Sequence, residues 1–133
     1  MPPPIDKLAW LHVFDRRVLG ARSRGKTTYY LPGGKREPGE SDGQALAREI
    51  KEELSIDLVA ETLAPAGVFE AQADAKPPGT LVRMICYRAD FRGEIAAAAE
   101  IEEVCWLGHG HRDRCSPALR LVLDRLLAAG EID

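Results

Sequence analysis

Hydrophobic positions along the chain form several short runs separated by turn residues, and two stretches with helical spacing. The short runs are rich in β-branched and aromatic residues, a pattern that predicts strands. The polar break "DRR" predicts a hairpin between the first two runs. The small-residue tract 96–99 fits either a loop or one helical turn. The predicted strands are residues 7–14, 18–22, 56–71 with a break near Pro65, 81–91 and 104–107.

Two helices are predicted from capping residues and apolar spacing. Ser41 serves as an N-cap and Gln44 completes a capping box, so a helix is predicted at 42–54. A second helix follows Ser116 as its N-cap and ends before Gly130. Its apolar stripe consists of Leu119, Val122, Leu123, Leu126 and Leu127.

Length and composition indicate one soluble globular domain over residues 1–133, of which 45% are hydrophobic and 29% charged. The net charge of -3 and the lack of a basic run argue against nucleic-acid polymers and membrane surfaces as partners. No membrane-spanning run or secretory signal is found, so a cytoplasmic location is expected. Cys86, Cys105 and Cys115 match no zinc spacing, and we expect reduced thiols, two of them in the core.

The predicted helix at 42–54 gathers Glu49, Glu52 and Glu53 on one stripe, where like charges cost about a few tenths of a kcal/mol per pair. Such a stripe is usually a solvated acidic face. Here it borders the apolar stripe and follows the Gly-rich turn 32–34, which can aim backbone groups into the same space. Clustered carboxylate and carbonyl oxygens are ligands for Mg²⁺ or Mn²⁺, so a metal site is the alternative. The apolar stripe consists of Leu46, Ala47, Ile50 and Leu54.

The 23 residues that begin at Gly34 resemble the Nudix box, G-x5-E-x7-R-E-U-x-E-E-x-G-U, where U is bulky and aliphatic. The preceding "LPGGK" is also similar to the family pattern. Ser55 stands where the family has Gly, just past the predicted helix end, where a left-handed conformation is common. No side-chain ligand is lost there, so the departure concerns loop geometry. The matching positions are Gly34, Glu40, Arg48, Glu49, Ile50, Glu52, Glu53 and Ile56.

The resemblance implies a Nudix-type α/β/α sandwich with a mixed β-sheet, and hydrolysis of a nucleoside diphosphate linked to another moiety. It implies that Glu52 and Glu53 are the principal Mg²⁺ (or Mn²⁺) ligands. Glu49 would be a further ligand or the base that activates water, and the Gly34 carbonyl a further ligand. Glu40 and Arg48 would chiefly hold the loop and helix together.

The family often adds a glutamate from a later loop. The candidates are Glu100, Glu102 and Glu103, and Glu103 is favoured as a catalytic residue because it lies just before the strand around Trp106. The other two are expected in a solvated turn.

Four cations are candidates for binding substrate phosphates: Arg22, Arg24, Lys26 and Lys35. A solubilising role is the alternative for at least one of the first three. His109 and His111 lack ligand spacing and are expected to be loop residues, and His12 a packed strand residue. Core packing is the expectation, and base stacking the alternative, for Trp10, Tyr29, Tyr30 and Phe69.

The substrate is the least determined feature. Two subfamily signs are absent: the block "SQPWPFPxS" of NADH pyrophosphatases, and the proline of ADP-ribose hydrolases, where Ala71 and Gln72 stand. The short chain and "LPGGK" resemble MutT-type enzymes, so hydrolysis of a (deoxy)nucleoside triphosphate, oxidised or not, to the monophosphate and pyrophosphate is predicted. The alternatives are a nucleotide-sugar or dinucleotide pyrophosphatase and a non-catalytic ligand sensor. The partner is thus a small nucleoside diphosphate derivative, and a homodimer is common in the family.

Overall fold

The computed structural model describes residues 3–133 and contains two main sheets, between which the chain passes more than once. The first sheet has the order β4-β1-β7-β6 and the second the order β2-β3-β9, while β5 and β8 form a separate short pair. β1 pairs with β7 in parallel, and the other strand pairs within residues 3–133 are antiparallel, so the predicted mixed sheet is confirmed. The strands are β1 (Ile5–Trp10), β2 (Val13–Phe14), β3 (Arg17–Ser23), β4 (Gly33–Gly34), β5 (Asp57–Leu58), β6 (Ala64–Gln72), β7 (Leu81–Arg88), β8 (Phe91–Arg92) and β9 (Ile101–Leu107).

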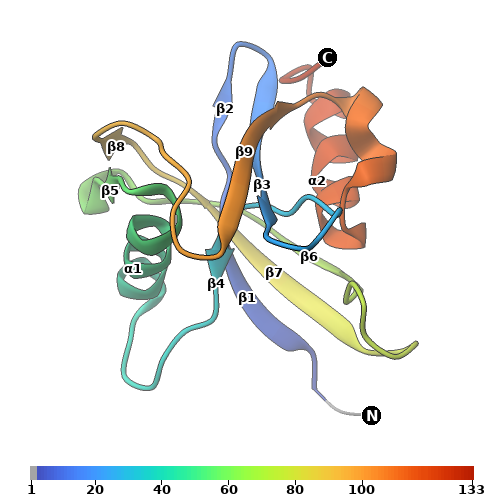
Figure 1. Cartoon of the computed structure of the whole chain (residues 1–133), viewed down its shortest axis with the longest axis horizontal. Helices are drawn as coiled ribbons and strands as arrows, with labels where there is room; N and C mark the ends of the chain where they lie inside the picture. Colours follow the sequence, from blue (N-terminus) through green and yellow to red (C-terminus); the bar gives the residue numbers. More distant parts are fainter. Residues whose placement is uncertain (1–2) are drawn as a thin grey trace.

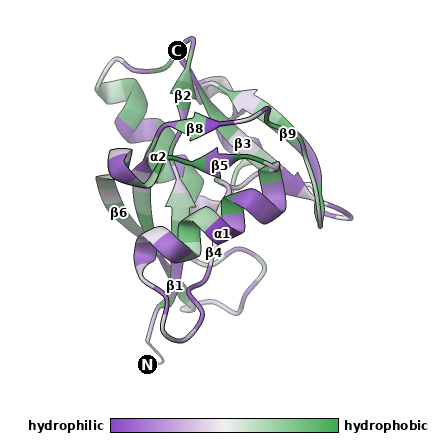
Figure 2. Cartoon of the chain, turned by 90° about the vertical axis from the view of Figure 1, so that its left-hand side faces the viewer, coloured by the Kyte–Doolittle hydropathy of each residue, from purple (hydrophilic) through white to green (hydrophobic). Residues whose placement is uncertain are grey.

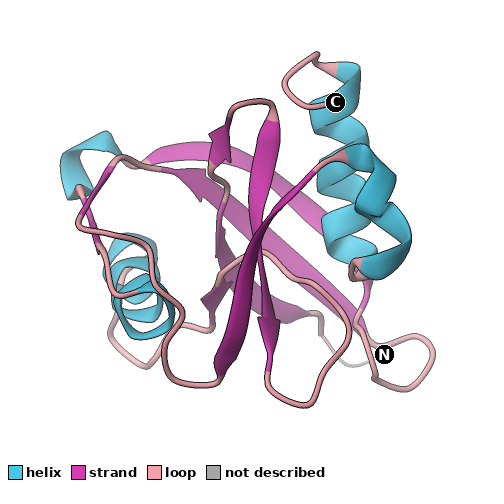
Figure 3. Cartoon of the chain, turned by 45° about the horizontal axis from the view of Figure 1, so that its top comes forward, coloured by secondary structure: helices cyan, strands magenta, loops and turns pink. Residues whose placement is uncertain are grey.

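The helices α1 (Asp42–Leu54) and α2 (Pro117–Ala128) flank the strands on opposite sides (Figures 1 and 3), as the sandwich prediction requires. Short 3₁₀ helices at Ala60–Thr62 and His109–Arg114 complete the elements. Each main helix covers its own hydrophobic core: α1 packs with Leu8 and Trp10, and α2 packs with Ala9 and Leu11. Successive residues of one strand therefore serve opposite cores, as a strand's alternation dictates.

Both helix predictions are confirmed at their N-termini. Ser41 accepts the N–H of Gln44, whose side chain accepts the N–H of Ser41 in return. Ser116 caps α2 by accepting the N–H of Leu119. On α1, Ala45 is fully buried and Ala47 only partly, so the apolar stripe is rotated slightly from the predicted one.

The predicted strand 7–14 is two strands in different sheets. The chain leaves the first sheet after Trp10, whose ring stacks on His12 at 4.6 Å, and β2 then joins β3 in the predicted hairpin. The turn residues Asp15 and Arg16 have φ values of 50° and 62°, which suits the twist of a tight hairpin. Hydrophobicity alone did not reveal the change of sheet, because both halves are apolar.

Two further boundaries differ from the prediction. The break near Pro65 is a bulge in β6 between Pro65 and Val68. The last strand, β9, begins at Ile101, earlier than predicted. The tract 96–99 is a loop, the first of its two predicted alternatives. The backbone N–H groups of Ala96 and Ala98 donate to the carbonyls of Leu54 and Glu53, which fastens this loop to the end of α1.

Candidate active site

The glycine turn before α1 lies directly against the carboxylates of that helix. A Cβ added to Gly34 would lie 2.4 Å from the carboxyl carbon of Glu49. A Cβ added to Gly33 would lie 2.0 Å from the carbonyl oxygen of Leu8, in the neighbouring strand β1. Gly33 requires glycine, because its φ is 151° and the backbone of Leu8 leaves no room for a Cβ, whereas a side chain at Gly34 would displace the Glu49 carboxylate. The turn therefore brings its backbone groups to the helix at close range.

Glu53 is the buried carboxylate of this region, with 6% of its surface exposed. Its Oε1 accepts a hydrogen bond of 3.2 Å from the backbone N–H of Gly33. Burial raises its pKa to about 7, because water no longer stabilises the charged form, while the Gly33 N–H and the Lys7 ammonium act in the opposite direction. Glu49 and Glu100 raise this pKa further through their negative charges. The negative charge of the carboxylates at this site therefore exceeds the positive charge of the groups around them.

Arg48 organises the outer part of the site. Its guanidinium donates to both carboxylate oxygens of Glu40, at 2.8 and 2.9 Å, and to Oε1 of Glu49 at 2.8 Å. It also donates to the carbonyl of Lys35, which fixes the loop between the glycine turn and α1. The hydrogen bonds from Arg48 hold the pKa of Glu40 at about 2. This is the holding geometry that the resemblance implies for Glu40 and Arg48.

The three glutamates of α1 differ in exposure. The side chain of Glu52 is 56% exposed and lies 3.7 Å from Arg48, whereas that of Glu49 is 17% exposed. Among residues 3–133, no three His, Cys, Asp or Glu side chains are already arranged to hold a metal ion. The oxygen donors still fit a hard divalent cation. Glu49, Glu52 and Glu53 lie on one stripe of α1 and differ in how deeply they are buried, and Gly34 lies against Glu49. Glu49, Glu52, Glu53 and the Gly34 carbonyl are the groups that would hold the cation.

The structure brings Glu100, and not Glu103, to Glu53. Glu100 lines the same cavity as Glu53, because the loop 96–99 is fastened to the end of α1. Glu103 lies in β9 opposite Arg22 and accepts hydrogen bonds from Arg22 at 3.1 Å and from the Tyr29 hydroxyl at 2.8 Å. These two hydrogen bonds lower the pKa of Glu103. The preference for Glu103 followed from a strand start placed too late in the sequence.

The four predicted cations lie in different surroundings. Lys26 lines the cavity that holds Glu53. Arg22 lies between Ala21 and Ser23, which line this cavity, so the alternation of β3 directs its side chain to the other face, where it meets Glu103. Arg24 and Lys35 are exposed. Lys26 is therefore the predicted cation that the structure places at the site.

The histidines and aromatic residues have mostly structural contacts. His109 Nε2 lies 2.8 Å from Oδ1 of Asp124, and the ring of His111 bonds to the backbone of Gly108. Trp10 is buried and its indole N–H donates to the carbonyl of Ala89, while Phe69 lies in the core on the α2 side. Tyr30 differs from these, because its ring lines two neighbouring cavities.

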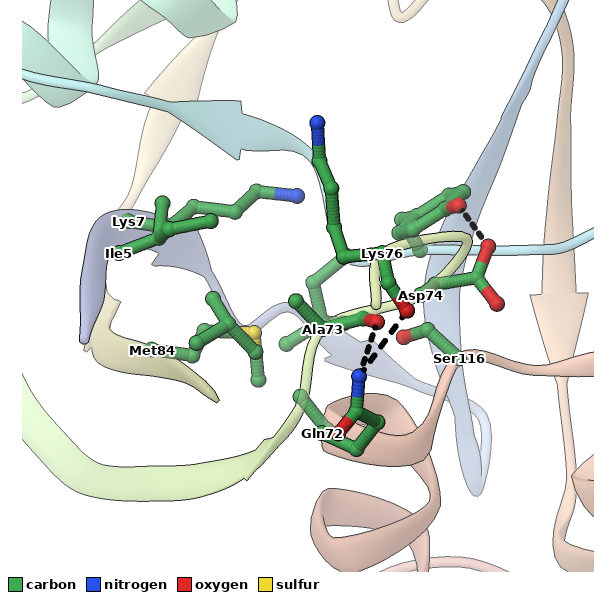
Figure 4. A pocket seen from close by; sticks show the side chains of 12 residues that line it. Ile5, Lys7, Gln72, Ala73, Asp74, Lys76, Met84 and Ser116 are labelled. Carbon is green, nitrogen blue, oxygen red and sulfur yellow. Dashed lines mark hydrogen bonds between the residues drawn. The ribbon is translucent and has the colours of Figure 1, made fainter. Parts of the chain in front are cut away.

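These two cavities adjoin each other along β1. The first, of about 270 Å³, contains Glu53, Glu100, Gly33 and Lys26. The second, of about 140 Å³, has mainly apolar walls, including Leu31, Val82 and Ala118. Its wall also includes Ile5 and Met84 (Figure 4). Lys7 and Tyr30 line both cavities. Sequence reasoning missed Lys7, for which the only signal was a charged residue at the start of an apolar run.

Comparison with known proteins agrees with this geometry. The family model of the NUDIX domain matches residues 7–111, most of the chain. The chain belongs to the Nudix hydrolase family. Its Nudix box is the segment that forms the glycine turn and α1 (Figure 2, where α1 crosses the front of the molecule). Proteins of this family generally use a divalent metal ion and act on nucleoside diphosphate derivatives.

Solved structures of Nudix proteins are similar over nearly the whole chain. The MutT Nudix hydrolase from Burkholderia pseudomallei is 25% identical, with 94% of this chain and 99% of that chain covered and a TM-score of 0.74. The E. coli ORF135 protein is 25% identical, with 93% and 89% covered and a TM-score of 0.72. Human 8-oxo-dGDP phosphatase NUDT18 is 44% identical over 46 residues, which are 35% of this chain and 14% of that protein.

Among residues 3–133, neither α1 nor α2 nor any other helix has the length and apolar character needed to cross a membrane.

Proposed function

We propose that this Nudix protein is a metal-dependent pyrophosphohydrolase that cleaves a nucleoside diphosphate linked to another moiety. The observation that carries the proposal is the buried carboxylate of Glu53, which accepts a hydrogen bond from the Gly33 N–H. Glu53 and Glu100 line the same open cavity. Buried negative charge is costly unless it is paired. An acidic cavity accepts an anionic pyrophosphate only through cations, so the site is suited to a metal-bound phosphate substrate.

The side chains of the site have separable roles in this proposal. A bound Mg²⁺ or Mn²⁺ ion would neutralise phosphate charge and lower the pKa of a water molecule. Glu52, Glu53 and the Gly34 carbonyl would hold the metal, with Glu100 in place of Glu103 as the added glutamate. Glu49 lies against Gly34 and is oriented by Arg48, so it is placed either to bind metal or to accept a proton from water. Glu40 keeps Arg48 in position.

The favoured substrate is a (deoxy)nucleoside triphosphate, cleaved to the monophosphate and pyrophosphate. The apolar cavity beside the carboxylates supports this choice, because a base and sugar need apolar walls next to a phosphate site. The name of the human relative adds oxidised guanine nucleotides to the substrates worth testing. A single domain, a homodimer and a cytoplasmic location stay predictions.

The test is a product assay with Mg²⁺ on a panel of nucleoside triphosphates, 8-oxo-dGTP, 8-oxo-dGDP, sugar nucleotides and dinucleotides. Release of monophosphate and pyrophosphate from one or more triphosphates is the expected result. Preferential cleavage of sugar nucleotides or dinucleotides would select the alternative enzyme. Tight metal-dependent binding without turnover of any compound would select the sensor and contradict the proposal.

A further inference from the structure

Lys7 is the unusual residue of β1, because it is a half-buried lysine whose strand neighbours Leu8, Ala9 and Trp10 are buried and apolar. Its side chain lines both the carboxylate cavity and the apolar cavity. Figure 4 shows the ammonium end directed into the space between the walls of the apolar cavity. Lys7 therefore lies where the two cavities meet.

No described residue accepts a hydrogen bond from the Lys7 ammonium, and no described carboxylate forms an ion pair with it within 4.0 Å. Its Nζ lies 5.1 Å from the centroid of the Tyr30 ring. An ammonium group has three N–H donors, and a ring face uses its charge without filling those donors. A half-buried cation with free donors needs acceptors that a ligand can bring.

The charges around Lys7 indicate which acceptors these are. Glu53 and Glu49 attract the ammonium across the carboxylate cavity. Divalent ions at those carboxylates, which the proposed function requires, would cancel that attraction and add positive charge near Lys7. An uncharged carbonyl would satisfy its donors and leave its charge uncompensated. An anionic oxygen satisfies both.

We propose that Lys7 binds the phosphate that stays attached to the nucleoside and so sets the position of the substrate between the two cavities. The proposal rests on the proposed function and adds a residue outside the Nudix box to it. With the scissile anhydride at the carboxylates and the nucleoside in the apolar cavity, the phosphate that joins them passes Lys7. Its test is the gain in affinity that a 5′-phosphate gives to a nucleoside.

The experiment is a titration of the folded protein, in Mg²⁺, with the 5′-monophosphates of adenosine, guanosine, cytidine and uridine and with the four nucleosides. Lys7→Met removes the charge and keeps most of the side-chain length. Loss of a charge-assisted hydrogen bond predicts that the monophosphate-to-nucleoside affinity ratio falls about tenfold. The affinity for the nucleoside itself should stay within about twofold, since Met preserves the wall of the cavity.

Lys51→Met is the matched control, because Lys51 lies on the exposed face of α1 and pairs with Asp57 at 3.3 Å. It changes the net charge equally and should leave the ratio unchanged. Lys7→Gln is used if Lys7→Met does not fold, as judged by thermal unfolding. A ratio that changes less than twofold in the Lys7 variant, or a wild-type protein that binds no monophosphate better than its nucleoside, overturns the proposal.

Measuring hydrolysis alongside binding separates a failure of the Lys7 proposal from a failure of the proposed function. Wild-type hydrolysis of the triphosphate panel with an unchanged ratio in the Lys7 variant would overturn the role of Lys7 alone. A Lys7-dependent ratio without hydrolysis of any compound would overturn the proposed function and leave Lys7 as an anion-binding residue.

Discussion

The two helices of this protein begin alike and differ in what they bury. Each has a serine N-cap, and each covers one of the two cores. The buried face of α2 is apolar throughout, whereas the buried face of α1 includes Glu53 among its apolar residues. The buried face of α2 is stabilised by apolar packing alone. On α1 the chain gives Glu53 a backbone hydrogen bond and crowds it with further carboxylates.

This difference teaches where the sequence serves stability and where it serves function. A helix selected only for stability would not hold a carboxylate at the rim of the core with like charges next to it. We therefore expect substitutions on α2 to act on the free energy of unfolding, and substitutions on the acidic stripe of α1 to act on activity.

The largest expected effect comes from Glu53→Gln, compared with Leu123→Ala in the buried face of α2. Loss of the carboxylate should lower kcat by about 100-fold or more, since it removes a metal ligand. In chelator, this variant should be as stable as the wild type or more stable. Leu123→Ala should lower the free energy of unfolding by about 2–5 kcal/mol through the cavity it leaves.

Urea unfolding and turnover at saturating Mg²⁺ measure both effects. Below the unfolding transition, Leu123→Ala should keep a kcat close to that of the wild type. The contrast between the helices is wrong if Glu53→Gln unfolds the protein or leaves kcat intact.

The pH dependence of stability in chelator is the next effect in size. The pKa of Glu53 is raised from 4.5 to about 7 in the folded protein, so the folded state holds this proton more tightly than the unfolded chain. Stability should fall as pH rises from about 4.5 to 7, by on the order of 3 kcal/mol from this group, and then level off. Other groups titrate in this window too, so the quantity to compare is the wild type minus Glu53→Gln.

Unfolding midpoints at half-unit pH steps supply that difference, and adding Mg²⁺ at pH 8 should restore stability to the wild type only. A difference that does not vary between pH 4.5 and 7 would show that burial does not govern the proton affinity of Glu53.

A smaller contrast separates the two later glutamates. Glu100→Gln should lower kcat/KM by about tenfold or more, because Glu100 lines the cavity that holds Glu53. Glu103→Gln should change it less, since Glu103 is occupied by Arg22 and Tyr29, and should mainly reduce stability by about 1 kcal/mol. The reverse order of the two activity losses would restore Glu103 as the added glutamate.

The smallest effect is expected at Ser55, where the box departs from the family pattern. Ser55 has φ 65° and ψ 22°, the left-handed conformation predicted for this position. Ser55→Gly should relieve about 1 kcal/mol of backbone cost, offset in part by loss of the hydroxyl hydrogen bond to the Ala96 carbonyl. Stability should be equal or higher and activity unchanged within about twofold. A large loss in thermal unfolding would mean that the contact with Ala96 governs the loop.

The helices were predictable because their signals are local. Ser41, Gln44 and Ser116 form their capping contacts within a few residues along the chain. Helical spacing also predicted the acidic stripe of Glu49, Glu52 and Glu53. The fixed length of the Nudix box predicted that this stripe lies near Gly34. Sequence patterns are sufficient to predict a contact when both of its partners lie close together along the chain.

The rest depended on contacts between distant segments. Nothing near Glu100 in the sequence shows that Ala96 and Ala98 donate to the end of α1, and this contact decides which glutamate enters the cavity. In the sequence, Lys7 is an ordinary residue of a predicted strand. Its position between two cavities becomes visible only when β1, Tyr30 and the glycine turn are placed together in the fold. The change of sheet after Trp10 also depends on a distant pairing, because β1 pairs with β7 whereas β2 pairs with β3.

The central claim is that Glu53 and a divalent ion together hydrolyse a phosphoric anhydride. The most direct measurement is a Mg²⁺ titration of monophosphate release from the best triphosphate of the panel, for the wild type and for Glu53→Gln. The account predicts saturable Mg²⁺-dependent turnover by the wild type, none in chelator, and a loss of about 100-fold or more in the variant at every Mg²⁺ concentration. Full turnover in chelator, or equal turnover by the two proteins, would contradict it.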